Sequence, residues 1–278
     1  MRPPRKKLTA GRFELSLDRP LVMGVVNITP DSFSDGGRFF NADQAVSHAR
    51  RLADEGADII DLGGESTRPG AEAVSESQEL ARVMPVLEKI QDLCVSVDTR
   101  RPAVMKAALA GGASMINDVE ALAAPGALAA VAESACAVCL MHKKGDPATM
   151  QRDPHYDDVV GEVKAYLEQR VTAAKAAGIA AARIVVDPGF GFGKTAQHNL
   201  ELLRNLSDLS ELPILAGLSR KSTLGKITGR PVDERLAGSL AMALLALQRG
   251  ATILRVHDVR ETRDVIAVWE AFEKTLRN

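Results

Sequence analysis

The segment 27–37 carries three oxygen-bearing side chains, Asn27, Asp31 and Asp35, spaced four residues apart. It follows an apolar run, and its proline and paired glycines mark it as a loop. An ordinary surface turn does not require such a set of side chains. The pattern predicts a ligand or metal loop, and a solvated turn rich in Asp and Ser is the alternative.

Short polar side chains also follow other apolar runs. Asp98, Asn117 and Asp187 are small donors and acceptors that suit a flat heterocycle with adjacent N–H groups, which they would hold through paired hydrogen bonds. Each could instead cap the next helix or pair with a neighbouring strand. Asp98, Asn117 and Asp187 are therefore candidate binding residues.

Positive charge gathers at the last two apolar runs. Lys221 and Arg255 stand there, in the part of a barrel that commonly holds phosphate. His257 lies two residues past Arg255, so both would face the same side of a strand. The pattern indicates an anion site, and a salt bridge to an acidic neighbour is the competing interpretation.

The segment 189–195, with the sequence GFGFGKT, invites comparison with a phosphate-binding P-loop. The P-loop pattern requires glycine five residues before Gly193, and Pro188 stands there. A dinucleotide site would want an acidic residue at the end of the next strand, and none is present. We predict a tight loop that brings its backbone and Phe192 close to a ligand.

The elements that must position these residues are short apolar runs that alternate with helical patterns. Glycines stand where several of the helices would end. Strict alternation predicts an α/β fold with a parallel sheet covered by helices, and eight units favour a closed (β/α)8 barrel over an open doubly wound sheet. The active site would lie at the C-terminal ends of the strands. The expected strands are 21–26, 59–62, 95–97, 115–116, 137–141, 184–186, 214–216 and 253–256, and the expected helices are 43–55, 77–90, 102–110, 159–177, 199–205, 233–248 and 260–276.

The chain is expected to form one domain. Residues 1–11 would be a flexible basic tail, a short strand or hairpin would precede the first barrel strand, and residues 12–278 would form the domain. The basic start leads into no apolar segment, so we expect neither a signal peptide nor a membrane anchor.

Composition and charge exclude several classes of function. The 278 residues carry 35 Lys and Arg against 36 Asp and Glu, which argues against general binding to nucleic acid or to a membrane surface. Cys94, Cys136 and Cys139 lie in or beside apolar runs, as reduced buried thiols do. Cys136 and Cys139 would point to opposite faces of a strand, which argues against a zinc or redox pair. We expect a cytoplasmic protein.

With these residues assembled, the chain resembles dihydropteroate synthase. The matching segments occur in the family's order over nearly the whole chain, and the first two are long and specific. They are MGVVNITPDSFSDGG at 23–37, GGESTRPG at 63–70, SVDT at 96–99, IND at 116–118, LMH at 140–142, DPGFGFGK at 187–194, SRKS at 219–222 and RVHD at 255–258.

The resemblance implies a single pterin-binding TIM barrel that joins p-aminobenzoate to 6-hydroxymethyl-7,8-dihydropterin diphosphate and releases pyrophosphate with Mg²⁺. Asn27 would hold the magnesium. The pterin and its diphosphate would contact Asp98, Asn117, Met141, Asp187, Lys221, Arg255 and His257. The p-aminobenzoate side, where sulfonamide inhibitors of the family also bind, would be shaped by Phe33, Thr67, Arg68, Pro69, Phe192 and Ser222.

The resemblance also implies a mechanism. An arylamine already has a free lone pair at neutral pH, so the barrier lies in expelling pyrophosphate. Magnesium with Arg255 and His257 would stabilise the departing charge, and Asp35 would stabilise cationic character at the reacting carbon, which favours a dissociative substitution. The catalytic candidates are Asp35, Lys221, Arg255 and His257.

Three other functions remain open at this point. A methyltetrahydrofolate-type methyltransferase domain shares the barrel and the pterin-binding carboxylates but needs no diphosphate site. A class I aldolase would use Lys221 as a Schiff base. A non-catalytic pterin-binding barrel should have lost the loop residues that are present here. The apolar segment 265–269 could pair two chains into a homodimer, or pack on the barrel.

Overall fold

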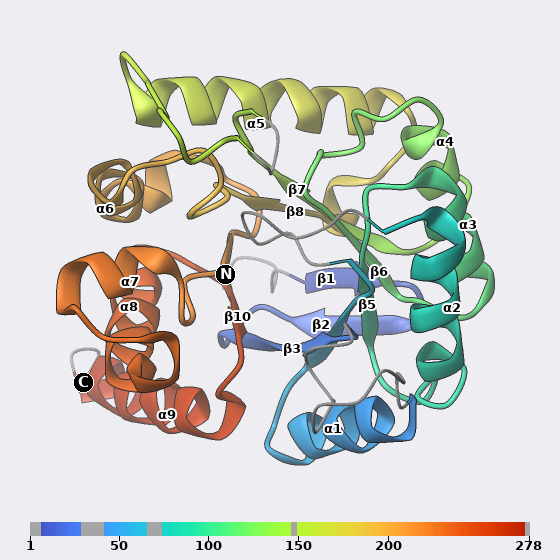
Figure 1. The fold of residues 1–278 in the computed structure, drawn as a ribbon, viewed down its shortest axis with the longest axis horizontal. Helices are drawn as coiled ribbons and strands as arrows, with labels where there is room; N and C mark the ends of the chain where they lie inside the picture. Colours follow the sequence, from blue (N-terminus) through green and yellow to red (C-terminus); the bar gives the residue numbers. More distant parts are fainter. Residues whose placement is uncertain (1–6, 29–41, 66–73, 146–148, 276–278) are drawn as a thin grey trace, which may run out of the picture.

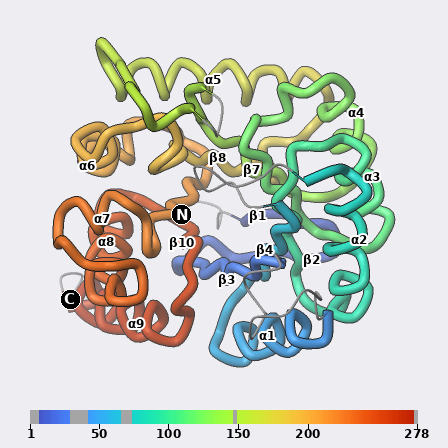
Figure 2. The backbone as a smooth tube through the Cα atoms, in the orientation of Figure 1, coloured from blue at the N-terminus to red at the C-terminus, as the bar shows by residue number. Residues whose placement is uncertain are grey.

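The described residues, 7–28, 42–65, 74–145 and 149–275 of a computed structural model, form a closed barrel of parallel strands ringed by helices (Figure 1). The sheet order is β8-β7-β6-β5-β4-β3-β10-β9, and a parallel bridge between Val186 and Ile214 joins the two ends. The first and last barrel strands, β3 and β10, lie side by side (Figure 2). The predicted (β/α)8 barrel is confirmed. Its strands are β3 Leu21–Asn27, β4 Ile59–Gly63, β5 Val95–Asp98, β6 Met115–Asp118, β7 Ala137–Met141, β8 Ile184–Asp187, β9 Leu215–Ala216 and β10 Ile253–Val256.

Helices cover the outside of the barrel. They are α1 Ala42–Asp54, α2 Glu76–Leu87, α3 Pro102–Ala110, α4 Ala127–Ala132, α5 Val159–Ala176, α6 Ala196–Arg204, α7 Ser222–Thr228, α8 Leu236–Gln248 and α9 Val259–Thr275, with 3-10 turns η1 Ala181–Arg183, η2 Leu206–Asp208 and η3 Val232–Glu234. The sequence patterns do not predict α4 and α7, because both are short and offer little periodicity. The helix α6 begins three residues earlier than expected, because Thr195 caps it by accepting from the His198 backbone amide.

Alternate residues of each strand face either the barrel interior or the helices. In β3, Leu21 and Met23 belong to the inner apolar cluster, whereas Val22 and Val26 pack in the outer cluster against the helices. Toward the C-terminal ends the inward positions become polar. Asn27, Gly63, Asp98 and Asn117 are neighbours in register across β3 to β6, so the strands deliver polar side chains to one rim. The inner apolar cluster consists of Leu8, Ala10, Leu21, Met23, Ile59, Cys94, Met115, Ala137, Cys139, Val185, Leu215 and Ile253.

An antiparallel hairpin of β1 Lys7–Ala10 and β2 Phe13–Ser16 closes the opposite end of the barrel. The predicted N-terminal strand or hairpin is confirmed. The expectation that residues 7–11 belong to a flexible tail is wrong, because Leu8 and Ala10 are fully buried in the inner cluster. Burial of this apolar face fixes the strand despite the basic residues around it.

The described cysteines, Cys94, Cys136 and Cys139, are free and buried. Cys136 lies in the outer cluster and Cys139 in the inner one, which confirms that the two thiols face opposite sides of the sheet. Within the described ranges, the helices lack the length and apolar composition that a bilayer crossing requires.

Asp58, just before β4, links several elements at the N-terminal end of the barrel. Its carboxylate accepts from the Val22 amide at 2.8 Å and from Arg19 Nη2 at 2.6 Å, and it also pairs with Arg263 of α9. The side chain of Asp58 is 10% exposed, so its bonds to Val22 and Arg263 are largely shielded from water, whereas Arg19 is half-exposed. They connect β3, β4 and the last helix at the end of the barrel away from the polar rim.

We expect Asp58→Ala to lower the free energy of unfolding by about 2–3 kcal/mol, because it leaves a buried amide and two guanidinium groups without their acceptor. Urea denaturation measures this change. Asp92→Ala is the matched control, since Asp92 also pairs with an arginine, Arg50, but is 61% exposed and should leave the midpoint unchanged. Equal effects of the two substitutions would contradict the role given to Asp58.

Candidate active site

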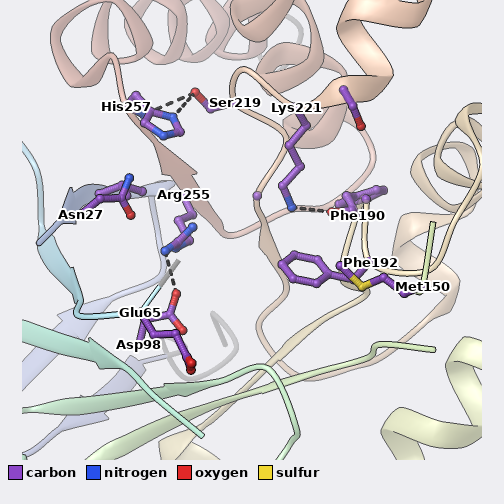
Figure 3. Close-up of a pocket in the computed structure, with 14 residues that line it drawn as sticks. Asn27, Glu65, Asp98, Met150, Phe190, Phe192, Ser219, Lys221, Arg255 and His257 are labelled. Carbon is purple, nitrogen blue, oxygen red and sulfur yellow. Dashed lines mark hydrogen bonds and ion pairs between the residues drawn. The ribbon is translucent and has the colours of Figure 1, made fainter. Parts of the chain in front are cut away.

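A cavity of about 300 Å³ opens at the polar rim of the barrel (Figure 3). It lies where the C-terminal ends of the strands meet their following loops, as a barrel active site does. The residues that line it are Val25, Asn27, Glu65, Asp98, Met150, Phe190, Gly191, Phe192, Gly217, Ser219, Lys221, Ser222, Arg255 and His257. Seven predicted site residues meet here: Asn27, Asp98, Phe192, Lys221, Ser222, Arg255 and His257.

Arg255 of β10 lies at the centre of an ionic network on the cavity floor. Its Nε donates to Asp61 Oδ2 at 2.7 Å, and its Nη2 donates to Asp98 Oδ2 at 2.9 Å. Asn117 Nδ2 donates to the same Asp61 oxygen at 3.2 Å. Burial opposes the charge on Arg255, but Asp61 and Asp98 outweigh it and raise the pKa of the guanidinium above its usual value. The arginine is therefore a permanent cation held by two acids.

Asp61 is a functional residue that the sequence-based site omitted. It is fully buried, and its Oδ1 atom has no hydrogen-bond partner among the described residues. The available signal was its position: Ile59 and Asp61 occupy successive inward positions of β4, so an acid interrupts an otherwise apolar interior. An unpartnered buried oxygen at a cavity floor is suited to a water molecule or to an N–H group of a ligand.

Asp98 has a strongly perturbed acidity. The pKa of its carboxyl is raised to about 7. Burial and the nearby Asp61 raise this pKa, and the charge of Arg255 lowers it. Near neutral pH this group therefore exchanges its proton readily. It can accept from a ligand N–H when ionised and donate to a ring nitrogen when protonated.

Lys221 and Asp187 carry opposite charges that influence each other at the rim. The Lys221 ammonium donates to the Phe190 carbonyl and lies 4.8 Å from the centre of the Phe192 ring. Burial lowers the pKa of Lys221 to about 8, and the charge of Asp187 opposes that shift. Burial raises the pKa of Asp187, whose Oδ1 also accepts from the Gly189 amide at 2.7 Å.

His257 follows β10 and faces the cavity near Asn27 (Figure 3). Its Nδ1 lies 3.0 Å from Ser219 Oγ, and its backbone amide donates to the same oxygen at 3.3 Å. The serine hydroxyl therefore orients the ring. With Lys221 and Arg255, the histidine makes one side of the cavity suitable for an anion.

Three further predicted residues lie at the rim without lining the cavity. Asn117 contacts the site indirectly, by donating a hydrogen bond to Asp61. Asp187 interacts through its charge with Lys221, which lines the cavity. Met141 is 4% exposed and is Asp187's partner in register, so it packs beneath the rim. The predicted residues Asp31, Phe33, Asp35, Thr67, Arg68 and Pro69 lie outside the described part of the chain.

Seven lining residues were not predicted as site residues: Val25, Glu65, Met150, Phe190, Gly191, Gly217 and Ser219. Glu65 and Ser219 are each two residues before a predicted site residue, Thr67 and Lys221. This closeness in sequence was the signal that could have identified them. Burial tends to raise the pKa of Glu65, but Arg101 and Arg100 outweigh it and lower that pKa. Phe190 lies in the segment 189–195, which the sequence already places close to a ligand. Met150 carries no polar signal, and only the fold brings it here.

Asn27, at the end of β3, offers a side-chain amide oxygen to a magnesium ion in the described cavity. The cavity also contains the carboxylates of Glu65 and Asp98, which already pair with Arg101 and Arg255. The described residues contain no group of three or more His, Cys, Asp or Glu arranged to hold a metal. Mg²⁺ commonly uses one or two protein oxygens and takes the rest from water and substrate phosphates. Asn27 fits such an ion only together with a phosphorylated ligand.

We expect the free energy of unfolding of Asp98→Asn, relative to that of the wild type, to be higher at pH 8 than at pH 5. The folded carboxyl ionises near pH 7 and the unfolded one near 3.8, so the folded state holds more protons between these values. The stability that Asp98 contributes is present below about pH 4 and is lost as the pH rises through 7. The asparagine variant lacks this loss.

Urea denaturation of both proteins at pH 5 and pH 8 measures the difference. The gain of the variant over the wild type should grow by at least about 1 kcal/mol between the two pH values. A gain that is the same at both would show that the Asp98 carboxyl has an ordinary acidity.

Comparison with known proteins places this geometry in a family. The family described as pterin binding enzyme matches residues 23–257. The dihydropteroate synthase of Neisseria meningitidis serogroup B is 54% identical over 273 residues, which cover 94% of this chain and 96% of the relative.

Two solved structures are similarly close. The dihydropteroate synthase of Xanthomonas albilineans, solved with 4-aminobenzoic acid, has a TM-score of 0.91 and 53% identity, covering 97% of this chain and 98% of that one. The dihydropteroate synthase of Yersinia pestis, solved as a sulfonamide drug complex, has a TM-score of 0.91 and 47% identity, covering 96% and 99%. The chain belongs to the dihydropteroate synthase family of pterin-binding enzymes.

Proposed function

We propose that this chain joins p-aminobenzoate to 6-hydroxymethyl-7,8-dihydropterin diphosphate, forming 7,8-dihydropteroate and releasing pyrophosphate. The observation that carries the proposal is the pairing of acids and cations at one rim of the barrel. Asp61, Asp98 and Asp187 surround two cations, Arg255 and Lys221, in a cavity large enough for a bicyclic ring. The family membership of the chain supports the same substrates.

The acids would bind the pterin. A pterin presents adjacent N–H groups along one edge, and a carboxylate can accept two of them at once. Asp187 and Asp98 offer such carboxylates, Asn117 offers both a donor and an acceptor, and the unpartnered Asp61 Oδ1 can accept one more N–H or water. The planar guanidinium of Arg255 is suited to stacking on the ring.

The cations would hold the diphosphate. Arg255 and His257 lie on the same strand extension and face the cavity together with Asn27 (Figure 3). Because the Ser219 hydroxyl already orients the His257 ring, little reorganisation is needed when the anion binds. The diphosphate would then lie beside the last strand, with the pterin deeper in the barrel.

The reaction is a substitution at the pterin methylene carbon. The bond between this carbon and the diphosphate oxygen breaks, and pyrophosphate leaves with the electron pair. The arylamine nitrogen forms the new bond with its lone pair and then loses a proton to solvent or to pyrophosphate. Arg255 and His257 stabilise the charge that develops on the departing oxygen, which is the costly part of the step.

We propose Mg²⁺ as the cofactor, held by Asn27 and by oxygens of the diphosphate. When bound, the ion would neutralise charge on the leaving group. The single amide oxygen that Asn27 contributes fits a metal that arrives with its phosphorylated substrate.

The second substrate would lie toward Phe192 and Ser222, the described residues of the predicted p-aminobenzoate side. A sulfonamide resembles p-aminobenzoate in shape, so we propose that sulfonamides compete for this side, in line with the Yersinia pestis complex. Phe33, Thr67, Arg68 and Pro69 complete this proposal from the sequence. Asp35 is proposed to stabilise the electron-poor methylene, and full turnover of Asp35→Asn would exclude that role.

We also propose a homodimer that forms through α8 and α9. Leu245, Val268 and Phe272 expose 44%, 72% and 57% of their surface on these two helices. A groove of about 600 Å³ lies between the helices, next to Val268 and Phe272. Of the predicted apolar segment, Ile266 packs on the barrel while Val268 faces outward, so the segment is suited to both packing and pairing.

Turnover is tested by incubating the protein with the pterin diphosphate, p-aminobenzoate and Mg²⁺ and measuring pyrophosphate. We expect release that depends on all three, and an Asn27→Ala variant that needs more Mg²⁺ for the same rate. Arg255→Met should lower kcat/KM by about 100-fold or more, because it removes a cation at the developing charge.

Arg230→Met is the control for Arg255→Met, since Arg230 is 64% exposed and pairs only at the surface with Glu234. It should keep wild-type turnover. Pyrophosphate release that does not require p-aminobenzoate, or no release at all, would overturn the proposed function.

Sedimentation equilibrium tests the dimer. The wild type should sediment with twice the mass of the chain, and Val268→Glu should shift the equilibrium to the monomer by placing a charge on the apolar surface. Lys164→Glu, a substitution on α5, is the control and should leave the mass unchanged. A monomeric wild type at micromolar concentration would contradict the dimer.

A further inference from the structure

A lysine outside the predicted site is almost completely buried beside the cavity. Lys194 is 2% exposed, and its ammonium lies 2.9 Å from His142 Nδ1, 3.0 Å from the Gly189 carbonyl and 3.0 Å from the Phe192 carbonyl. The His142 carbonyl lies somewhat farther away, at 3.4 Å. All four acceptors are neutral, and together they satisfy the three hydrogens of an ammonium. The polar end of Lys194 is therefore fully used inside the protein.

The surroundings keep His142 as an acceptor. Burial and the charge of Lys194 together lower the pKa of His142 to about 3, so the ring is neutral at physiological pH. Burial also lowers the pKa of Lys194 to about 7. Burying an ammonium without a contacting carboxylate costs free energy, and an apolar side chain of the same length would avoid that cost. A lysine at this buried position therefore indicates a role other than packing.

The loop that Lys194 binds depends on glycine. Gly189, Gly191 and Gly193 have φ values of +67°, +82° and +63°, in the left-handed region that favours glycine. A Cβ atom at Gly189 would come within 1.9 Å of the His142 carbonyl oxygen, and one at Gly193 within 2.1 Å of the Lys144 carbonyl oxygen. The loop therefore lies directly against the backbone that follows β7.

One backbone hydrogen bond, from the Phe192 amide to the Gly189 carbonyl at 3.1 Å, closes the turn. The three glycines otherwise restrict its backbone little. Side chains also hold the loop through hydrogen bonds. Lys194 donates to two of its carbonyls from inside, Tyr156 Oη donates to the Gly193 carbonyl at 3.0 Å, and Asn199 Oδ1 accepts from the Gly191 amide at 2.8 Å. Gln151 donates to the Gly191 carbonyl and Lys221 to the Phe190 carbonyl. Among these side chains, Lys194 contacts both ends of the turn, at Gly189 and at Phe192.

The same loop forms one wall of the cavity (Figure 3). The Phe190 carbonyl accepts from the Lys221 ammonium, and the Phe192 ring lies 4.8 Å from it. A shift of the turn would therefore move the Phe192 ring and the partner of Lys221 together.

We propose that Lys194 is a positioning residue for the second substrate: by gathering the carbonyls of Gly189 and Phe192 around its ammonium, it holds the Phe192 ring in place against Lys221. The inference rests on the proposed function, because it assigns the Phe192 wall to the arylamine. Lys194 itself does not touch the substrates, and its effect passes through the loop.

The test is Lys194→Met, which keeps the length of the side chain and removes its three donors. In the pyrophosphate assay, KM for p-aminobenzoate should rise about tenfold, while KM for the pterin diphosphate changes less than about threefold. Hydrogen exchange of the Gly191 and Phe192 amides should become faster. Val131→Ala on α4, a core substitution far from the cavity, is the control and should lower the melting temperature without changing either KM.

An unchanged KM for p-aminobenzoate in Lys194→Met, with or without a lower melting temperature, would overturn the proposal. If that variant does not fold, His142→Leu removes the ring nitrogen from the four acceptors and should raise the same KM by about threefold. No rise there would likewise overturn it. Wild-type turnover is measured in parallel, so a silent wild type counts against the proposed function and not against the role of Lys194.

Discussion

The site depends on one ionic contact, the guanidinium of Arg255 held between the carboxylates of Asp61 and Asp98. Neither the cation nor the acids could stay charged in the barrel interior alone, because removing a charge from water is costly unless a partner compensates it. The contact joins β10 to β4 and β5, which lie beyond β3 in the sheet, so it requires the sheet to curve around β3. The curvature of the barrel thus assembles the site.

Much of this architecture is readable from the sequence, because a parallel barrel leaves a strong pattern. Apolar runs, glycines at helix ends and a polar residue after each run locate the strands and the rim that carries the site. Pairings across the barrel are not readable in this way. Asp61 and Arg255 are 194 residues apart, and no local pattern says that they touch. The short helices α4 and α7 were missed because six or seven residues offer too little periodicity.

Lys194 illustrates the limit more sharply. In the sequence it belongs to a Gly-Lys-Thr segment that suggests phosphate binding, and excluding a P-loop leaves the lysine without a role. The fold turns its ammonium away from the cavity and into the loop, onto two backbone carbonyls and a neutral histidine. Only three-dimensional burial reveals this, because a lysine at such a position would be expected at the surface. The hairpin boundary was misjudged for a related reason, since burial of Leu8 outweighs the basic residues beside it.

The central claim is that the buried acids recognise the pterin itself, independently of the diphosphate. Calorimetric titration with 6-hydroxymethyl-7,8-dihydropterin, which carries no phosphate, tests this most directly. The wild type should bind it, and Asp187→Asn should bind it at least about tenfold more weakly, because an amide places a donor against the ligand's own N–H group. Equal affinity of the two proteins, or no binding by the wild type, would contradict the account.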